Sequence, residues 1–486
     1  MPRSSRKVSR PAPPGKAALV LASGGITGVA YEVGALRALD HVLTNRTVND
    51  FDIYVGTSAG AVVSAALASG IPPIMLAGLL TGSVPGFSRL GRLQLYRPNV
   101  GEIASRLVGA PDLVRRAALE YWRFRDRIPL SEAIYGLAPL LPSGLFTNSG
   151  LEQYLRETFA IAGLSDDFRD VKSELHIIAA DIESNKRADF SRLTTPNVAI
   201  SRAVAASTCI PLLFRPVEIE GHHYIDGGIK SHAAIDVAIS RGAKLIVVIN
   251  GLVPLDTAAI KPRASTQEGH SSILDLGMRA IGNQVIRGML HDSLIDHLQK
   301  VRAKHPEVDF ILIEPRPDDE KMFFHELLSF SAQLIVMQHG YETVSKGIYE
   351  SWPYLARILP KHGIEITRRV IDRKPLQVPV NELERSGNIL GRLFQTVLDR
   401  RTTATGETPD ISARIAARAG GRAATAARTA EKPARKAARK AAPKAARKPA
   451  AKKATATRQR ATAARRTTRR IGNFRPRVIS SDTAEA

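Results

Sequence analysis

A five-residue stretch, Gly56-Thr57-Ser58-Ala59-Gly60, constrains the fold of this chain more than any other feature of its sequence. The apolar residues 51–55 before it are typical of a buried strand, and the small apolar residues 61–68 after it are typical of a helix packed on a sheet. Glycines on both sides of the serine permit a sharp strand-to-helix turn that holds the hydroxyl out at the carboxyl edge of the sheet. The pattern therefore predicts a nucleophilic Ser58 that hydrolyses by acyl transfer. An ordinary turn with a helix-capping serine is the alternative.

The rest of the chain repeats this alternation of strand and helix. Apolar runs occur at 17–22, 51–55, 175–180, 245–250 and 310–314, and helical patterns occur at 30–42, 151–159, 197–206, 233–241 and 332–347. Continuous apolar strands separated by helices predict a mostly parallel sheet that is covered on both faces. We therefore expect an α/β three-layer sandwich over about 17–400, and 486 residues that are 44% hydrophobic suffice for it.

The alternation breaks down between residues 71 and 145, where Gly, Pro, Leu and Arg are frequent. This composition predicts a helical insertion, which we expect to cap the site. Aromatic and cationic residues gather at 121–125, a mixture that suits a membrane interface. An amphipathic helix packed on the core explains the same pattern equally well.

The net charge of +23 is concentrated at the C-terminus. Residues 401–486 hold 23 Lys and Arg against 5 Asp and Glu, whereas residues 1–400 hold 46 and 41. The tail repeats Ala, Lys, Arg and Pro, resembles linker-histone tails, and cannot bury enough apolar area to offset the entropy of ordering. We predict that 401–486 and a basic arm at 1–16 are disordered. Such a polycation binds polyanions without reading sequence, so anionic membrane, nucleic acid and polyphosphate are candidate partners.

The cellular setting is indicated by three features. The single cysteine, Cys209, excludes an intrachain disulfide and fits a reducing compartment. No apolar run reaches 18 residues, so no membrane span is predicted, and the apolar start at 17–22 is too short and too soon followed by glycines for a signal peptide. We expect a cytoplasmic protein, with peripheral contact at the inner membrane surface. No metal-ligand spacing is visible, and we expect no metal and no cofactor.

A second glycine-rich turn, Ser23-Gly24-Gly25-Ile26-Thr27-Gly28, lies between the first strand and the first helix. Adjacent glycines leave backbone N–H groups uncovered beside the positive end of a helix, where they suit a developing oxyanion. Nucleotide binding is the rival interpretation, because Asp50 and Asp52 lie where a ribose-binding acid would stand. Its G-x-G-x-x-G fingerprint, however, lacks the first glycine, since Ser23 occupies that position. A plain structural turn is the third interpretation.

Two further motifs follow downstream. Tyr224-Ile225-Asp226-Gly227-Gly228 comes after the apolar stretch 214–219, and an aspartate before two glycines is by itself a common turn. Residues 203–211 form a helical run of small side chains that stops at Pro211 and permits close backbone packing. None of the twelve histidines stands in a local pattern that marks a general base, and His222 and His223 are typical of an exposed hairpin.

Taken in order, the three glycine motifs resemble the signatures of patatin-like phospholipases, over about 17–250 and more weakly to 350. The resemblance implies a serine–aspartate dyad in which Ser58 attacks the ester carbonyl and Asp226 accepts the proton and returns it to the leaving alcohol. It also implies that the N–H groups of Gly24, Gly25 and Ile26 hold the oxyanion. The motif turns would be supported by further glycines: Gly28, Gly56, Gly60, Gly227 and Gly228.

This resemblance predicts a serine lipid acyl hydrolase of phospholipase A or lysophospholipase type. Asp226 must then lie in a partly desolvated site, where its pKa can rise. A lipid substrate favours anionic membrane as the partner of the tail, because each nearby cation contributes about 1 kcal/mol to membrane binding.

The chain departs from the family's loop at two positions. The family has Gly where Ser23 stands and Arg or Lys where Thr27 stands, which puts activity on anionic phospholipids and the catalytic rate in doubt, but not the fold or the dyad. One alternative is a weak or inactive scaffold whose tail binds nucleic acid or another polyanion. The other is an α/β-hydrolase whose base is one of three distant histidines: His270, His325 or His339.

Overall fold

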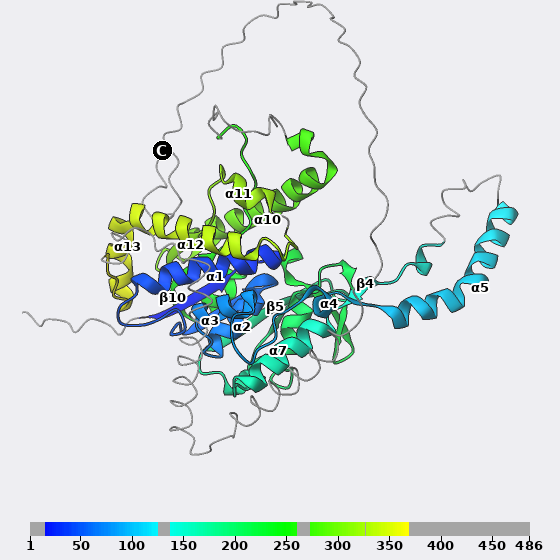
Figure 1. The fold of residues 1–486 in the computed structure, drawn as a ribbon, viewed down its shortest axis with the longest axis horizontal. Helices are drawn as coiled ribbons and strands as arrows, with labels where there is room; N and C mark the ends of the chain where they lie inside the picture. Colours follow the sequence, from blue (N-terminus) through cyan, green and yellow to red (C-terminus); the bar gives the residue numbers. More distant parts are fainter. Residues whose placement is uncertain (1–14, 125–136, 260–272, 326, 369–486) are drawn as a thin grey trace, which may run out of the picture. The chain divides into compact units, whose positions relative to one another are not determined.

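The five strands predicted for the parallel sheet all form, each within about two residues of its expected position. They are β1 (Lys16–Leu21), β2 (Ile53–Thr57), β5 (Glu174–Asp181), β10 (Ala243–Ile249) and β11 (Asp309–Ile313). The structure, a computed structural model, describes residues 15–124, 137–259, 273–325 and 327–368 (Figure 1). The predicted disordered tail at 401–486 and nearly all of the predicted arm at 1–16 lie outside these residues.

The sheet is mixed and mostly parallel, in the order β11-β10-β1-β2-β5-β9-β8. The first five strands pair in parallel. Three shorter strands add antiparallel pairs beside β5: β6 (Arg187–Phe190), β8 (Val217–Ile219) and β9 (His222–Asp226). Strands β8 and β9 form the hairpin that the two histidines at 222–223 predict.

Both faces of the sheet are buried, which makes the fold the predicted three-layer α/β sandwich. Alternate residues of β1 enter different cores, because successive side chains of a strand point to opposite faces. Leu19 and Leu21 join the core that contains α1 and α12, whereas Val20 joins the core that contains α9 and α10. Figure 1 shows α12 lying along α1, and these two helices make the most extensive helix contact of the described residues.

Six predicted helices form, each within about five residues of its expected bounds: α1 (Gly25–Val42), α2 (Ala59–Ala68), α7 (Ser149–Ile161), α8 (Ile200–Ser207), α9 (Ile235–Ser240) and α12 (Gln333–Glu350). Three further helices are not predicted: α10 (Gly277–Lys304), α11 (Glu320–Phe324) and α13 (Trp352–Ile358). Short 3-10 turns are η1 (Ala138–Leu140), η2 (Phe168–Asp170), η3 (Gly227–Ile229), η4 (Ile273–Leu276) and η5 (Leu359–His362). No helix among the described residues is both long enough and apolar enough to cross a membrane.

Helix α10 is the main element that the sequence pattern does not predict. Its first half turns Met278, Val285 and Met289 outward, while Arg287 is fully buried. The Arg287 guanidinium donates to the carbonyl oxygen of Met322 at 2.9 Å and to Asn283 Oδ1 at 3.0 Å. An ordinary amphipathic helix buries its apolar side chains and exposes its polar ones, and the first half of α10 does the reverse. Its hydrophobic periodicity therefore does not indicate which face is buried.

The segment 71–145 contains the predicted helices and, in addition, two short strands. The helices are α3 (Pro73–Thr81), α4 (Arg92–Leu95) and α5 (Val100–Phe124), and the strands are β3 (Arg97–Pro98) and β4 (Gly144–Thr147). These strands form a second sheet with β7 (Leu212–Phe214), in the order β3-β4-β7. Residues 125–136 of the segment lie outside the described residues.

A buried acid on α1 generates a prediction about stability. Glu32 is buried, and its carboxylate oxygens find no hydrogen-bond partner among the described residues. Burial raises the pKa of Glu32 well above its ordinary value. The folded state therefore binds a proton at this carboxyl where the unfolded state, with a pKa of about 4.3, does not, so the free energy of unfolding falls as pH rises above that value.

We expect Glu32→Gln to raise the melting temperature, and by more at pH 8 than at pH 5, because glutamine cannot ionise. Each kcal/mol regained corresponds to about 2–4 °C. Thermal unfolding followed by circular dichroism at the two pH values measures the effect. Glu157→Gln, at an exposed position, is the matched control, and an equal gain for Glu32→Gln at both pH values would contradict the prediction.

Candidate active site

Ser58 occupies a strained turn between β2 and α2. Its backbone has φ 54° and ψ −114°, a conformation that costs a non-glycine residue about 1–3 kcal/mol and persists only where its surroundings hold it. The Ser58 N–H donates to Ser207 Oγ at 2.8 Å, and that hydroxyl donates in turn to the carbonyl oxygen of Ile178 at 2.5 Å. A Cβ on Gly60 would overlap the carbonyl oxygen of Leu21, so only glycine lets α2 begin this close to β1.

The sheet register brings Asp226 beside Ser58. Thr57 pairs with Ile178 on one side of β5, and Asp226 pairs with Ala179, the next residue, on the other side. Ser58 Oγ donates to Asp226 Oδ2 at 2.5 Å, and the two residues are only 4% and 8% exposed. The structure therefore joins two predicted site residues that are 168 positions apart in the sequence.

The environment of Asp226 makes it a stronger base than an ordinary aspartate. Its Oδ1 accepts the N–H of Gly228 at 2.8 Å, and its own N–H donates to the carbonyl oxygen of Cys209 at 2.8 Å. Burial raises the pKa of Asp226 to about 6. The hydrogen bonds from Ser58 and Gly228 lower this pKa, but their effect is smaller than that of burial. The carboxyl is then mostly ionised at pH 7 yet can accept a proton during a reaction.

The loop before α1 presents free backbone donors. The N–H groups of Gly24, Gly25 and Ile26 donate to no acceptor among the described residues. The flanking N–H groups are bound, Ser23 to the carbonyl oxygen of His232 at 3.0 Å and Thr27 to that of Leu327 at 3.1 Å. Free N–H groups at the N-terminus of an 18-residue helix create a positive potential that suits an anion.

Gly25 is required in this loop for two reasons. Its φ of +62° lies in the left-handed region, and a Cβ there would lie 2.6 Å from the carbonyl oxygen of Leu327. The two departures from the family's loop are both buried. Thr27 Oγ1 finds no hydrogen-bond partner among the described residues, so the position that would carry a cation here carries a small buried hydroxyl.

An apolar cavity of about 120 Å³ opens beside these groups. Gly25, Ile26 and Ser58 line it together with apolar side chains that include Val62, Leu76 and Leu151. Part of the segment 71–145 thus borders the site, through six residues: Ile71, Leu76, Leu79, Leu80, Leu90 and Leu95. The cavity suits a hydrocarbon chain, because the lining of the cavity has almost no polar surface.

The two acids required by the nucleotide-binding interpretation lie away from the loop 23–28. Asp52 precedes β2 and accepts the N–H of Ala17 at 2.8 Å, at the opposite end of the strands from the loop 23–28. Asp50 binds Thr47 in the same region. His339 Nε2 lies 2.7 Å from Asp319 Oδ2, whereas the Ser58 hydroxyl donates to Asp226. His270 lies outside the described residues.

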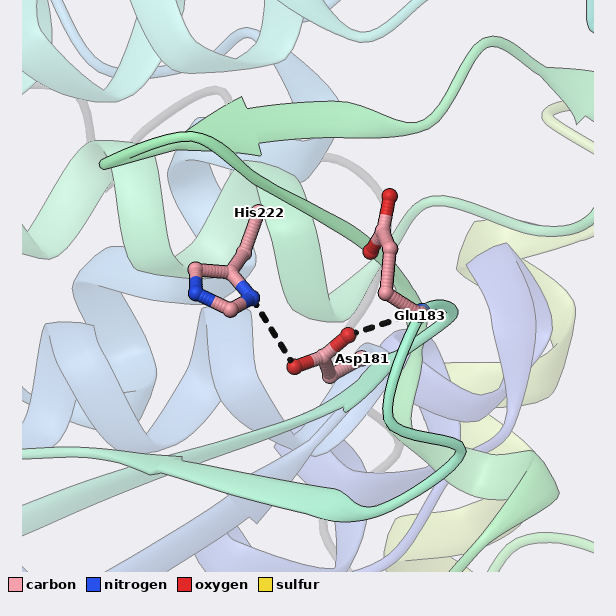
Figure 2. Close-up of side chains that lie close together, drawn as sticks. All are labelled: Asp181, Glu183 and His222. Atoms are coloured by element: carbon pink, nitrogen blue, oxygen red, sulfur yellow. Dashed lines mark hydrogen bonds and ion pairs between the residues drawn. The ribbon is translucent and has the colours of Figure 1, made fainter.

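One cluster of possible metal ligands forms at the end of β5 and the start of β9. Figure 2 shows Asp181, Glu183 and His222, whose ligand atoms all lie within 4.8 Å of one another. His222 Nδ1 lies 3.3 Å from Asp181 Oδ2, and Glu183 also binds His223 Nδ1 at 2.6 Å. No local sequence pattern marks this cluster, because its histidine is some forty positions from its acids. The N–H of Glu183 also donates to Asp181 Oδ1 at 2.9 Å, which helps to hold the cluster together.

Two polar residues of the site were also missed from the sequence. Ser207 lies within the run of small residues at 203–211, where nothing distinguishes its hydroxyl from a packing residue. His232 follows the Asp226 turn by six positions, and its partners Ser23 and Asn250 are 209 and 18 positions away. Only the three-dimensional structure shows that Ser207 supports the Ser58 turn and that His232 contacts Ser23.

Known proteins resemble the chain over much of this region. Residues 19–239 match the family model described as patatin-like phospholipase. The probable lipid hydrolase 463L of Invertebrate iridescent virus 6 is 23% identical over 227 residues, which are 46% of this chain and 62% of the viral protein. The chain therefore spans less than two thirds of that relative.

Two solved structures are similar at low identity. VipD from Legionella pneumophila is 16% identical, with 69% of this chain and 67% of that chain covered and a TM-score of 0.30. The type III effector protein ExoU is 17% identical, with 81% and 64% covered and a TM-score of 0.31. Ser58, Asp226 and the loop 23–28 all fall within the range of the family match. Residues 19–239 of this chain are thus similar to the patatin-like phospholipases.

Proposed function

We propose that the protein is a serine lipid acyl hydrolase that cleaves carboxylic ester bonds through a Ser58–Asp226 dyad. The observation that carries the proposal is the 2.5 Å hydrogen bond from a serine at a strained turn to a buried aspartate. Free N–H groups and an apolar cavity beside this pair support it, and so does the family match over 19–239.

The first half of the reaction forms an acyl-enzyme. Asp226 Oδ2 accepts the hydroxyl proton as Ser58 Oγ attacks the ester carbonyl carbon. The negative charge on the carbonyl oxygen of the tetrahedral intermediate is held by the N–H groups of Gly24, Gly25 and Ile26, and each such donor is worth a few kcal/mol in a transition state. The carbon–oxygen bond to the alcohol breaks as Asp226 protonates the leaving oxygen.

The second half releases the acid. A water molecule gives a proton to Asp226 and attacks the acyl carbonyl carbon, and the same N–H groups hold the oxyanion again. The bond to Ser58 Oγ breaks as Asp226 returns the proton to it, so the enzyme is regenerated. The two half-reactions together consume one ester and one water and yield one carboxylic acid and one alcohol.

The apolar lining of the cavity supports an acyl chain as the part of the substrate that is bound. We infer a substrate of phospholipid or lysophospholipid type, cleaved as by a phospholipase A or lysophospholipase. Because Thr27 supplies no charge near the loop, we expect neutral and zwitterionic headgroups to be accepted more readily than anionic ones.

Labelling with a fluorophosphonate probe tests the nucleophile. We expect the wild type to be labelled, Ser58→Ala to be unlabelled, and Asp226→Ala to be labelled about 10²-fold more slowly, because a general base is lost. Ser64→Ala, another buried serine of the same turn region, is the matched control and keeps normal labelling. Labelling that survives in Ser58→Ala would reject the nucleophile, and an unlabelled, inactive wild type would favour the scaffold alternative.

The raised pKa of Asp226 generates a prediction about pH. The dyad needs an ionised Asp226, so kcat/KM rises about tenfold per pH unit up to about pH 6 and is level above it. Stability follows the opposite direction. The folded pKa of about 6 exceeds the unfolded value of about 3.9, so the folded state gains stability from the bound proton below this window and loses it as pH rises through the window.

Asp226→Asn is therefore expected to be inactive but more stable than the wild type at pH 8, with a difference that shrinks toward pH 4. The gain scales with the shift, at about 1.4 kcal/mol per pKa unit. Chemical unfolding at both pH values, beside a pH profile of ester hydrolysis, provides the measurement. A profile with its midpoint near pH 4 would contradict both expectations.

We also propose that helix α5 contacts a membrane. Val108 is 84% exposed, and Leu107 and Trp122 are each 67% exposed, on a helix that also carries Arg115 and Arg116. Aromatic, aliphatic and cationic side chains together suit the interface of a lipid bilayer. The basic tail would strengthen attachment to anionic lipid at the cytoplasmic membrane surface, with nucleic acid or polyphosphate as its other candidate partners.

Flotation with vesicles of phosphatidylcholine and phosphatidylglycerol tests the role of α5. We expect a Val108→Ser, Trp122→Ala double variant to lower the bound fraction several-fold, because it removes buried apolar area at the interface. Leu193→Ser removes an exposed apolar side chain elsewhere and serves as the control. Unchanged flotation of the folded double variant would show that α5 does not contact the membrane.

A further inference from the structure

A buried chain of hydrogen bonds begins at the loop before α1. Ser23 Oγ lies 2.5 Å from His232 Nδ1, and His232 Nε2 lies 2.9 Å from Asn250 Oδ1. Asn250 Nδ2 then donates to Glu314 Oε2 at 3.1 Å. Ser23, His232 and Asn250 are all buried, so these bonds form away from competing water and are costly to leave unmade.

The direction of each bond follows from the surroundings of Asn250. Its Oδ1 accepts the N–H of Leu252 at 2.9 Å and its Nδ2 donates to the carbonyl oxygen of the same residue at 3.1 Å, which fixes the orientation of the amide. His232 Nε2 therefore faces an acceptor and carries the hydrogen. Burial lowers the pKa of His232 to about 4, so the ring is neutral and its Nδ1 accepts the hydroxyl hydrogen of Ser23.

These hydrogen bonds connect the two parts of the proposed active site, the loop before α1 and the turn that carries Asp226. Ser23 directly precedes Gly24, and its N–H also donates to the carbonyl oxygen of His232 at 3.0 Å. On the other side, a Cβ on Gly228 would lie 3.0 Å from both Ser23 Oγ and Asp226 Oδ1. Ser23 thus packs against the turn that carries Asp226, and two bonds to His232 hold it there.

We propose that Ser23 and His232 are positioning residues, whose hydrogen bond aligns the N–H groups of Gly24, Gly25 and Ile26 with Ser58 and Asp226. The inference rests on the proposed hydrolase function. Neither side chain touches the reacting atoms in this role. Their effect is to hold the donors where the oxyanion forms, and a displacement of about 1 Å there is enough to cost about 10²-fold in rate.

A double-mutant cycle distinguishes positioning from a general loss of stability. Ser23→Ala, His232→Ala and the double variant are made in the full chain and assayed with p-nitrophenyl butyrate. We expect each single variant to lower kcat about 10- to 100-fold while KM changes less than about twofold. The double variant is expected to be no slower than the slower single variant, because both changes break the same bond.

His362→Ala provides the matched control. His362 is also buried and lies 2.8 Å from Asp309 Oδ2 through its Nε2, but it lies at the opposite end of the strands from Ser58. We expect this variant to lower the melting temperature about as much as His232→Ala does, with kcat unchanged. Combined with Ser23→Ala, its effects on kcat are expected to multiply as those of independent sites do.

The same assay separates failure of this inference from failure of the proposed function. Turnover that persists in Ser58→Ala would reject the function itself. If Ser58→Ala is inactive but Ser23→Ala and His232→Ala keep wild-type kcat, raise KM instead, or multiply in the double variant, the positioning role is wrong. Ser23→Ala removes a single oxygen, so it carries the test alone if His232→Ala does not fold, and a wild-type kcat for Ser23→Ala would then overturn the inference.

Discussion

The parallel pairing of β1 with β2 is the constraint on which the rest of the site depends. Leu21 lies level with Gly56, so the loop after β1 and the turn after β2 leave the sheet side by side. Strand β9 runs in the opposite direction along β5 and ends level with the same edge, which delivers Asp226 from the far side. Three segments distant in sequence meet there because their strands share one hydrogen-bonded register.

Much of this arrangement is readable from the sequence, because it is local. Apolar runs mark the strands, and glycines mark the turns at 23–28, 56–60 and 226–228, so the confirmed fold follows from pattern alone. The family match over 19–239 supports the resemblance that these motifs indicate. The proximity of Ser58 and Asp226 also agrees with it, although their roles stay a proposal.

What could not be read from the sequence depends on distant or atypical contacts. Strands β3 and β4 are two and four residues long, too short for a periodic signal, and exist because β4 pairs with β7. Helix α10 buries Arg287 and exposes apolar side chains, so its sequence pattern does not indicate an amphipathic helix. The role proposed for His232 depends on its contact with Ser23, which is 209 positions away in the sequence. The serine at 23, which counts against the family's loop in sequence, is in the structure a hydrogen-bonding residue.

The position of β10 has a consequence for where this domain can be divided. The family match ends at residue 239, yet β10 follows it and lies between β1 and the edge strand β11. A fragment ending at 239 would leave one side of β1 with an unpaired row of backbone groups, flanked by apolar side chains, and such an edge templates association between chains. It would also lose Asn250. The end of the family match is thus not the end of the folded domain. We expect a fragment that ends at residue 239 to aggregate when it is expressed.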